Sequence, residues 1–258
     1  MKRPLLAILL ASAASLACDR NQNDRPDAGA DPYEPARQSA ADQTNANMHE
    51  AEKRNEREER AEAKREASEL VQKATVTLGK MKKDESLKKL LGDAKGVFLV
   101  PEFGRAAAGV GVRGGEGVLI ARREGKGWSD PAFYNVGGIS LGAQLGGEGG
   151  EIAMILMSDD ALKPFKNKNS FSLDAGAGVT MVDYSSLAQA STGRDVGNVV
   201  FWSSTKGAFV GVNLGASDIN WDEEENSAYY GATATPEEAL SRAGSAPKGK
   251  LQEELTGI

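Results

Sequence analysis

The stretch Gly96-Val97-Phe98-Leu99-Val100-Pro101 decides the fold of this chain, because from Gly96 onward the apolar pattern takes a period of two. An apolar run of this length, rich in valine and phenylalanine, is typical of a buried strand. Residues 139–145 show the same period as an alternation, with apolar side chains at every second position. The sequence therefore predicts a β-sheet that begins at Gly96.

Further strands are expected after short connections. They cover residues 107–113, 117–122, 132–136, 151–157, 171–179, 199–203 and 208–214. Many strands on short connections favour an antiparallel sheet. Residues 92–150 hold 17 of the 30 glycines, and glycine within a strand marks a bend, a ligand or a close backbone approach. We therefore expect an α+β fold whose mainly antiparallel sheet is strongly curved or barrel-like.

The segment before the sheet predicts an amphipathic helix followed by a shorter one. Apolar residues at helical spacing form a stripe, made of Ala63, Ala67, Leu70, Val71, Ala74, Leu78 and Met81. A second helix is expected over residues 84–91, with Asp84 as its N-cap and Gly92 as its stop signal. Two more short helices are expected, one at residues 158–165, opened by Ser158, and one at residues 236–243.

Residues upstream of the stripe have too few apolar side chains to pack against a core. Residues 49–66 are almost entirely Glu, Arg, Lys and Ala, and opposite charges three or four positions apart favour a solvated helix. Residues 19–48 are polar and contain three prolines, which predicts a disordered tether. The chain thus divides into a leader (1–18), the tether (19–48), the charged helix (49–66), a folded domain (67–235), and a C-terminal helix and frayed tail (236–258).

The leader has the pattern of an export signal. A basic start precedes a short apolar stretch, residues 5–17, which is followed by Cys18, the only cysteine of the chain. This arrangement predicts a bacterial lipoprotein signal, in which Cys18 is acylated, for example with palmitate, and becomes the mature N-terminus. The alternative is ordinary signal cleavage after Ala17. We expect an exported, membrane-anchored protein that faces the periplasm or the cell surface.

Composition and charge exclude several classes of function. Residues 94–258 carry 14 lysines and arginines against 20 aspartates and glutamates, which leaves no broad cationic surface for nucleic acid. One cysteine and one histidine exclude a disulfide framework, a Cys/His zinc site and a Cys–His catalytic pair. We therefore expect no nucleic-acid partner, no cofactor, no metal and no catalytic residue.

Three motifs resemble a phosphate-binding loop, a nucleophilic serine and a calcium site, but we interpret each of them as part of the fold. Residues 109–114 satisfy G-x-G-x-x-G, yet a strand rather than a phosphate-binding helix is expected to follow. Ser140 lies in a G-x-S-x-G motif whose surroundings alternate as a strand, and the only histidine, His49, lies outside the folded domain. The acidic run 222–225 is interpreted as a solvated strand end rather than a calcium site, because it lacks the alternating ligands of an EF-hand loop.

Several segments, taken in order, resemble the SYLF lipid-binding domain family. They are residues 94–101, 117–119, 127–134, 137–138, 142–146, 157–162, 203–211 and 229–231. The resemblance covers roughly residues 65–235 and implies a lipid-binding module. Eukaryotic relatives bind phosphoinositides and some associate with actin, whereas secreted bacterial relatives are commonly lipoproteins. Because this chain has a bacterial-type export signal, we expect no actin partner.

The resemblance also implies that an amphipathic helix at the start of the domain, here residues 67–91, engages the membrane. Six lysines beside its apolar stripes are the candidate lipid-binding residues: Lys73, Lys80, Lys82, Lys83, Lys88 and Lys89. Near an anionic bilayer a lysine contributes about 1 kcal/mol to binding. The alternative interpretation is that the stripes pack onto the sheet and the lysines form their solvated outer face. The aromatic residues Trp128, Phe133, Tyr134 and Trp202 are interpreted as core residues rather than acyl-chain contacts.

Together these features predict a non-enzymatic envelope lipoprotein that binds lipid, with membrane phospholipids as its partners. The alternative is a structural or protein-interaction envelope lipoprotein. Such a protein would use the same β core, without lipid specificity, to bind another envelope protein or a second copy of itself.

Overall fold

The computed structural model describes residues 34–108, 110–123, 125, 127–137, 150–173, 181–184, 197–204, 216–242 and 250–258. The chain divides into two units, Met1–Lys53 and Arg54–Ile258. Several predicted features lie outside the described residues. They are Cys18, Ser140 and the strands expected at residues 139–145 and 208–214.

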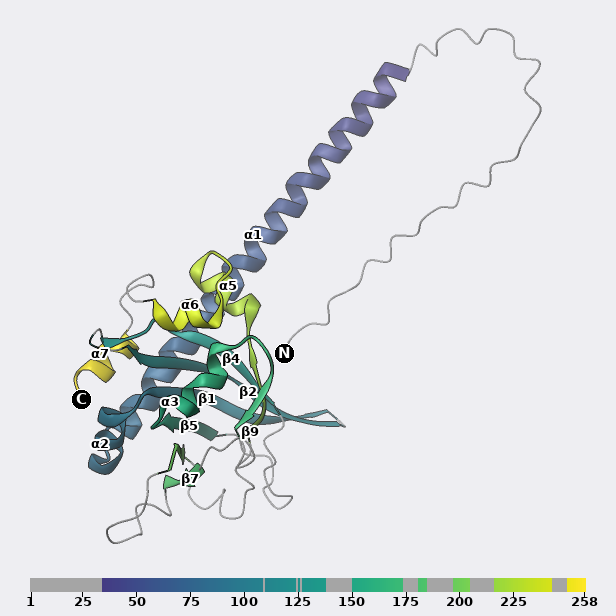
Figure 1. Ribbon diagram of the computed structural model, residues 1–258. Helices are drawn as coiled ribbons and strands as arrows, with labels where there is room; N and C mark the ends of the chain where they lie inside the picture. The colour runs from purple at the N-terminus through teal and green to yellow at the C-terminus, as the bar shows by residue number, and fades with distance from the viewer. Residues whose placement is uncertain are drawn as a thin grey trace, which may run out of the picture. The chain divides into compact units, whose positions relative to one another are not determined.

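Helix α1, Glu34–Met81, is the first described element (Figure 1). It begins inside the predicted tether, so residues 34–48 are helical. Pro35 lies in the first turn, where a helix does not use the backbone N–H that proline lacks. The alanines that follow favour a helix without any apolar stripe, which is why a pattern search for such a stripe misses this start.

The sheet of the second unit consists of long central strands and short outer ones. Its strands are β1 (Gly96–Ala108), β2 (Val110–Arg123), β3 (Gly127–Trp128), β4 (Ala132–Gly137), β5 (Gly150–Leu156), β6 (Phe171–Leu173), β7 (Met181–Asp183), β8 (Val199–Ser203) and β9 (Ala216–Trp221). The order is β6-β9-β4-β2-β1-β5-β8-β7, and β3 pairs with β2. Among the described strands, neighbours pair antiparallel except β7 and β8, which are parallel.

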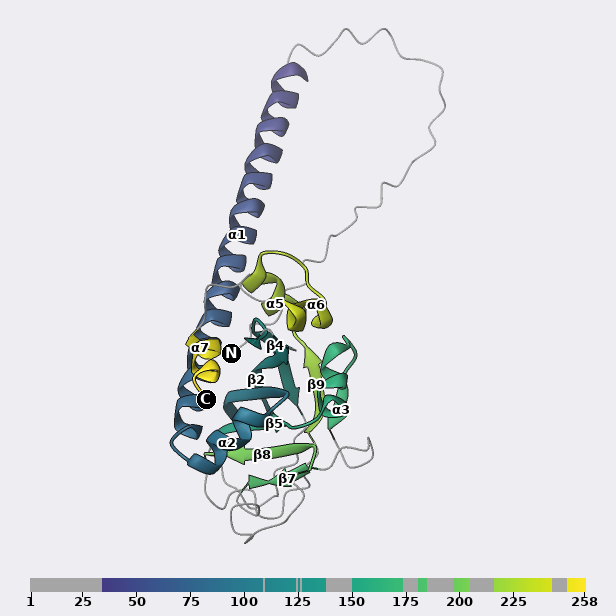
Figure 2. The ribbon, with the colours of Figure 1, turned by 60° about the vertical axis from the view of Figure 1, so that its left-hand side comes forward.

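The sheet is open, so the prediction of a strongly curved or barrel-like sheet was wrong. Its outermost strands are β6 and β7, and the ribbon is neither closed nor strongly curled (Figure 2). The glycines that suggested curvature instead make room for neighbours. A Cβ at Gly117 would lie 2.4 Å from Cζ of Phe98, and a Cβ at Gly115 would lie 2.6 Å from the carbonyl oxygen of Glu102.

Helices cover both faces of the sheet because successive strand residues point to opposite sides. Phe98 and Val100 of β1 belong to a core shared with α3 (Asp159–Leu162), η1 (Lys163–Lys166) and α6 (Pro236–Ser241). Val97 and Leu99 belong to a second core shared with α1, α2 (Glu85–Asp93) and α7 (Lys250–Thr256). Figure 2 shows α1 and α3 on opposite sides of the sheet.

Short helices begin where cap residues satisfy free backbone N–H groups. The side chains of Asp84 and Ser158 cap α2 and α3, as the sequence predicts. Asp222 caps α5 (Glu223–Tyr230) in the same way. The acidic run 222–225 is therefore the start of a helix rather than the predicted strand end, since carboxylates are favourable in a first helical turn.

The chain end is also folded, although the sequence predicted a frayed tail there. Helix α7 buries Leu251 and Leu255, four positions apart, in the second core. Two apolar residues in a short polar segment are too weak a pattern to predict a packed helix.

Candidate functional site

The turn between α1 and α2 is the centre of the candidate site, and Asp84 fixes its geometry. The Asp84 side chain accepts hydrogen bonds from the backbone N–H groups of Ser86 (2.9 Å) and Leu87 (3.2 Å). A hydrogen bond from Tyr184, just after β7, lowers the pKa of Asp84 below its ordinary value of 3.8. The start of α2 is thus held by its own backbone and by the sheet.

The other end of α2 is held by Arg122 of β2. Its guanidinium donates to the carbonyl oxygens of Ala94 (2.8 Å) and Gly92 (2.7 Å), which are free because a helix end leaves its last carbonyls unpaired. The same group lies 4.4 Å from the centre of the Trp128 ring, a cation–π contact. Leu87 and Leu91 are buried, so the orientation of α2 is fixed at both ends and along one side.

The apolar stripe of α1 packs onto the sheet. Leu70 and Val71 are 7% exposed, and Ala74, Leu78 and Met81 are fully buried. They share the second core with strand residues such as Val97 and Ile155. The sequence allowed two interpretations of this stripe, and the structure has the one in which the stripe packs onto the sheet. A bilayer therefore has no access to the stripe while α1 is docked.

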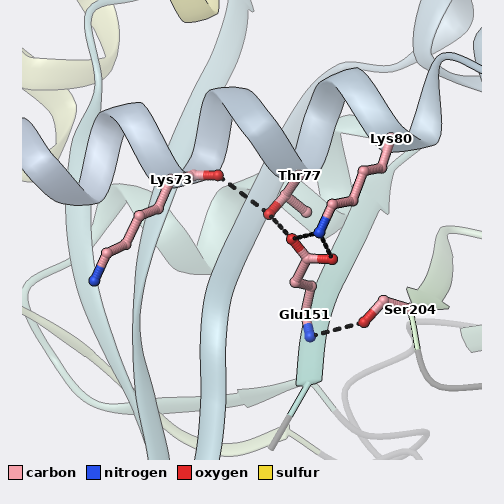
Figure 3. Close-up of polar contacts among 5 residues, drawn as sticks. All are labelled: Lys73, Thr77, Lys80, Glu151 and Ser204. Carbon is pink, nitrogen blue, oxygen red and sulfur yellow. Dashed lines mark hydrogen bonds and ion pairs between the residues drawn. The ribbon is translucent and has the colours of Figure 1, made fainter.

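Three of the six predicted lysines form ion pairs within the domain. Lys80 Nζ lies 2.8 Å from both carboxylate oxygens of Glu151 at the start of β5, and Thr77 Oγ1 donates to the same carboxylate at 2.9 Å (Figure 3). Lys73 Nζ lies 2.8 Å from Glu102 of β1, and this hydrogen bond raises the pKa of Lys73. Charged groups on the outer side of α1 thus help to dock it.

The third of these ion pairs joins the turn to the C-terminal helix. Lys82 Nζ donates to the carboxylate of Glu254 at 2.6 Å and to the backbone oxygen of the same residue at 2.8 Å. The Lys82 side chain is only 20% exposed. Lys82 is therefore occupied by α7 rather than presented to solvent.

The other three predicted lysines remain available. Lys83 and Lys89 are exposed and Lys88 is half-buried, and within the described part of the chain none of them forms an ion pair. We name Lys83, Lys88 and Lys89 the turn lysines. They lie on a short segment whose backbone is fixed by Asp84 and Arg122, and together they form the cationic part of the candidate site.

The remaining observations concern the aromatic residues, the possible metal ligands and the lengths of the helices. Trp128, Phe133 and Tyr134 are buried and Trp202 is half-buried, so the aromatic residues belong to the core as predicted. Burial raises the pKa of Tyr134. In the part of the chain that the structure describes, His, Cys, Asp and Glu side chains form no group of three that could hold a metal ion. Each helix within the described ranges is too short or too polar to cross a bilayer.

Sequence reasoning missed the residues that decide which lysines are available. Glu102, Glu151 and Glu254 lie 29, 71 and 172 positions from their lysine partners. Pairings over such separations leave no local pattern. Glu151 carries the one sequence signal that could have been used, because an acidic residue directly precedes the apolar run Ile152–Leu156 of a buried strand and needs a partner there.

Comparison with protein families gives a match over residues 137–256. The matching family is Ysc84, described as "Las17-binding protein actin regulator". This segment includes β5, β8 and β7 at one end of the sheet, β9 and β6 at the other end, and the helices that follow β9.

Three curated relatives are similar to this chain. An SH3 domain-containing protein of Schizosaccharomyces pombe is 30% identical over 155 residues, 59% of this chain and 36% of the relative. LAS seventeen-binding protein 3 of Saccharomyces cerevisiae is 32% identical over 132 residues, 50% of this chain and 29% of the relative. SH3 domain-containing YSC84-like protein 1 of Homo sapiens is 28% identical over 150 residues, 55% of this chain and 41% of the relative. The chain thus spans less than half the length of these relatives.

Proposed function

Because this chain belongs to the Ysc84/SYLF domain family, we propose that it is a non-enzymatic protein that binds phospholipid at the surface of an anionic bilayer. The family consists of domains that generally bind rather than catalyse, and it is known for lipid and actin binding. In this proposal the ammonium groups of the candidate site contact the anionic headgroup of a lipid.

The turn lysines are the observation that carries this proposal. They place three ammonium groups on the α1–α2 turn and the helix that follows it, and none of them forms an ion pair within the described residues, although Asp84 and Glu85 lie next to Lys83 in the chain. Each lysine near an anionic bilayer contributes about 1 kcal/mol to binding. Lys73, Lys80 and Lys82 contribute less in this proposal, since each would have to exchange a carboxylate partner for a headgroup.

Vesicle flotation tests the proposal. The chain beginning at Asp19, which lacks the apolar leader, is mixed with vesicles of phosphatidylcholine alone or with 30% phosphatidylglycerol. We expect flotation on the anionic vesicles, and a loss of about tenfold or more in affinity for the triple variant Lys83→Gln, Lys88→Gln, Lys89→Gln.

The matched control removes three exposed lysines elsewhere, with Lys53→Gln, Lys64→Gln and Lys166→Gln. It changes the net charge equally and should bind within about twofold of the unchanged chain, because charges more than a Debye length of ~8 Å from the bilayer are screened. Absence of flotation by the unchanged chain, or an equal loss in the control, contradicts the proposal.

We further propose that the protein is exported and anchored by acylation of Cys18. The support is the leader pattern, a basic start and a short apolar stretch that ends at the only cysteine. In cells supplied with a clickable palmitate analogue, the chain should be labelled and sediment with membranes, and Cys18→Ser should abolish the labelling. A labelled Cys18→Ser protein would place the acyl group elsewhere.

Protein binding is the second candidate, and the description of the matching family as Las17-binding favours it. For an exported chain, the partner in this case would be an envelope protein or a second copy that contacts the β core. Sedimentation velocity of the purified chain tests self-association, and co-sedimentation with actin filaments should leave the chain in the supernatant. A chain that dimerises tightly and ignores vesicles would support this candidate over lipid binding.

A further inference from the structure

Helix α7 covers part of the second core beside the turn lysines. Leu251 and Leu255 are at most 2% exposed, and they share the core with Met81, Leu87 and Leu91. At the chain end, Ile258 Cγ2 lies 3.5 Å from the position that a Cβ at Gly92 of α2 would take. The covered surface is therefore apolar and adjoins both α1 and α2.

Two residues of α7, Gln252 and Glu254, make the polar contacts that hold it in this place. Gln252 Nε2 donates to the backbone oxygen of Ser129 (3.0 Å) and to the carboxylate of Asp130 (2.9 Å). The carboxylate of Glu254 accepts from Lys82, next in the chain to Lys83. The Glu254 carboxylate thus already pairs with Lys82, which directly precedes the first of the turn lysines.

We propose that α7 is an autoinhibitory strap, seated where an acidic phospholipid of the bilayer surface binds once α7 has left. This inference rests on the proposed function. The chemistry of α7 matches that of the lipid, since two apolar side chains enter the core and one carboxylate sits on Lys82. When α7 leaves, Lys82 becomes a fourth cation beside the turn lysines, next to newly exposed apolar surface.

The strap is α7 rather than α1 because α7 is held by fewer contacts. The stripe of α1 buries Leu70, Val71, Leu78 and Met81 and is reinforced by the ion pairs of Lys73 and Lys80. Helix α7 has seven residues, two of which are buried leucines. Elements with few buried contacts open at the lowest free energy.

The first test compares two neighbouring glutamates. Glu254→Gln removes the ion pair with Lys82, whereas Glu253→Gln removes the same charge from an exposed position. On vesicles with 30% phosphatidylglycerol, Glu254→Gln should bind about fivefold more tightly than Glu253→Gln, because a larger fraction of the protein is open. Equal affinities of the two variants would mean that only net charge matters, and would overturn the strap.

The second test locks α7 in place. The double variant Gly92→Cys, Ile258→Cys is chosen because Ile258 Cγ2 lies 3.5 Å from the position of a Cβ at residue 92, and the chain that begins at Asp19 has no other cysteine. We expect the oxidised form to bind anionic vesicles at least fivefold more weakly than the same protein after reduction. Equal binding by the two forms overturns the strap and leaves the lipid-binding function standing.

The outcomes separate the two claims. If neither the unchanged chain nor any variant floats, the proposed function fails and the strap fails with it. If the unchanged chain floats weakly on anionic vesicles while Glu254→Gln and the reduced double variant float more strongly, both the proposed function and the strap are supported. Hydrogen exchange gives an independent readout, since anionic vesicles should speed exchange in residues 250–256 and neutral vesicles should not.

Discussion

Residues 54–66 and residues 67–81 are consecutive parts of α1, yet different forces keep them helical. In the first part the side chains are almost all exposed, and charged residues pair along the helix, as Arg65 does with Glu62 (3.6 Å) and Glu69 (3.9 Å). In the second part a stripe is buried, and the lysines pair with carboxylates of the sheet. A count of the six candidate lysines therefore overstates the charge that a membrane can use, because three of them pair with carboxylates of the same domain.

The largest difference between the two parts should come from shortening a buried side chain. Leu78→Ala removes a fully buried leucine and should lower the free energy of unfolding by about 2–5 kcal/mol. Arg60→Ala, at an exposed position of the first part, should change it by less than about 0.5 kcal/mol. Urea denaturation followed by tryptophan fluorescence measures both. A similar effect of the two variants would contradict the docking of α1.

A smaller effect is expected at the polar contact shown in Figure 3. Glu151→Ala removes the carboxylate that accepts hydrogen bonds from Thr77 and Lys80, and should cost about 1–3 kcal/mol, because the fully buried Thr77 hydroxyl keeps only its longer bond to the backbone oxygen of Lys73 (3.2 Å). Lys80→Ala removes the half-exposed partner and should cost at most about 1 kcal/mol. The same urea experiment ranks the two variants, and the reverse order would mean that Thr77 does not depend on Glu151.

The cap that ends the docked part gives a pH-dependent effect. Asp84→Ala should cost about 1 kcal/mol at pH 7. The pKa of Asp84 lies below its ordinary value of 3.8 in the folded protein, so its ionised form stabilises the fold above that value, and the stabilisation is lost as the pH falls through the folded pKa. The difference in the free energy of unfolding between the unchanged protein and the variant should therefore become smaller below about pH 4. A difference that stays constant down to pH 2 argues against this role, and Asp93→Ala serves as the control.

The smallest effect is expected in the charged part. Arg65→Gln removes two exposed pairings and should weaken the local helix by about 0.3–0.5 kcal/mol. Hydrogen exchange of residues 60–69 should show this difference at low salt and lose it at 1 M NaCl, where the Debye length is about 3 Å. Persistence of the difference at high salt would assign it to helix propensity rather than to charge.

The elements that depend on local patterns could be predicted from the sequence. The stripe of α1, the caps Asp84 and Ser158, and the period of two from Gly96 all lie within a few residues of the structure they specify. Helix α7 and the start of α1 could not be predicted in this way. Helix α7 has only two buried apolar residues, and the start of α1 has no apolar stripe. The open sheet was also missed, because a glycine that bends a strand and a glycine that admits a neighbour look identical in sequence.

The candidate site was predictable only in part for the same reason. The turn lysines lie close together in sequence, so their clustering follows from a short helix and its cap. The pairing of Lys73, Lys80 and Lys82 depends on strands and a helix that meet them only in the folded chain. Arg122 gave no signal either, because the carbonyls that it binds are unpaired only once α2 has formed.

Gly117 has a consequence for which mutations this fold can survive. The Phe98 ring that covers it is fully buried and lies against Tyr134 and Phe165, at 6.0 and 5.4 Å between ring centres, so a shift of this ring would disturb both neighbours. A change to alanine, the mildest in any substitution table, would place a methyl group inside that ring's volume. At this position the single hydrogen atom that glycine has for a side chain is required as strictly as any large side chain in the core. Random mutagenesis should therefore recover almost no tolerated replacement of Gly117.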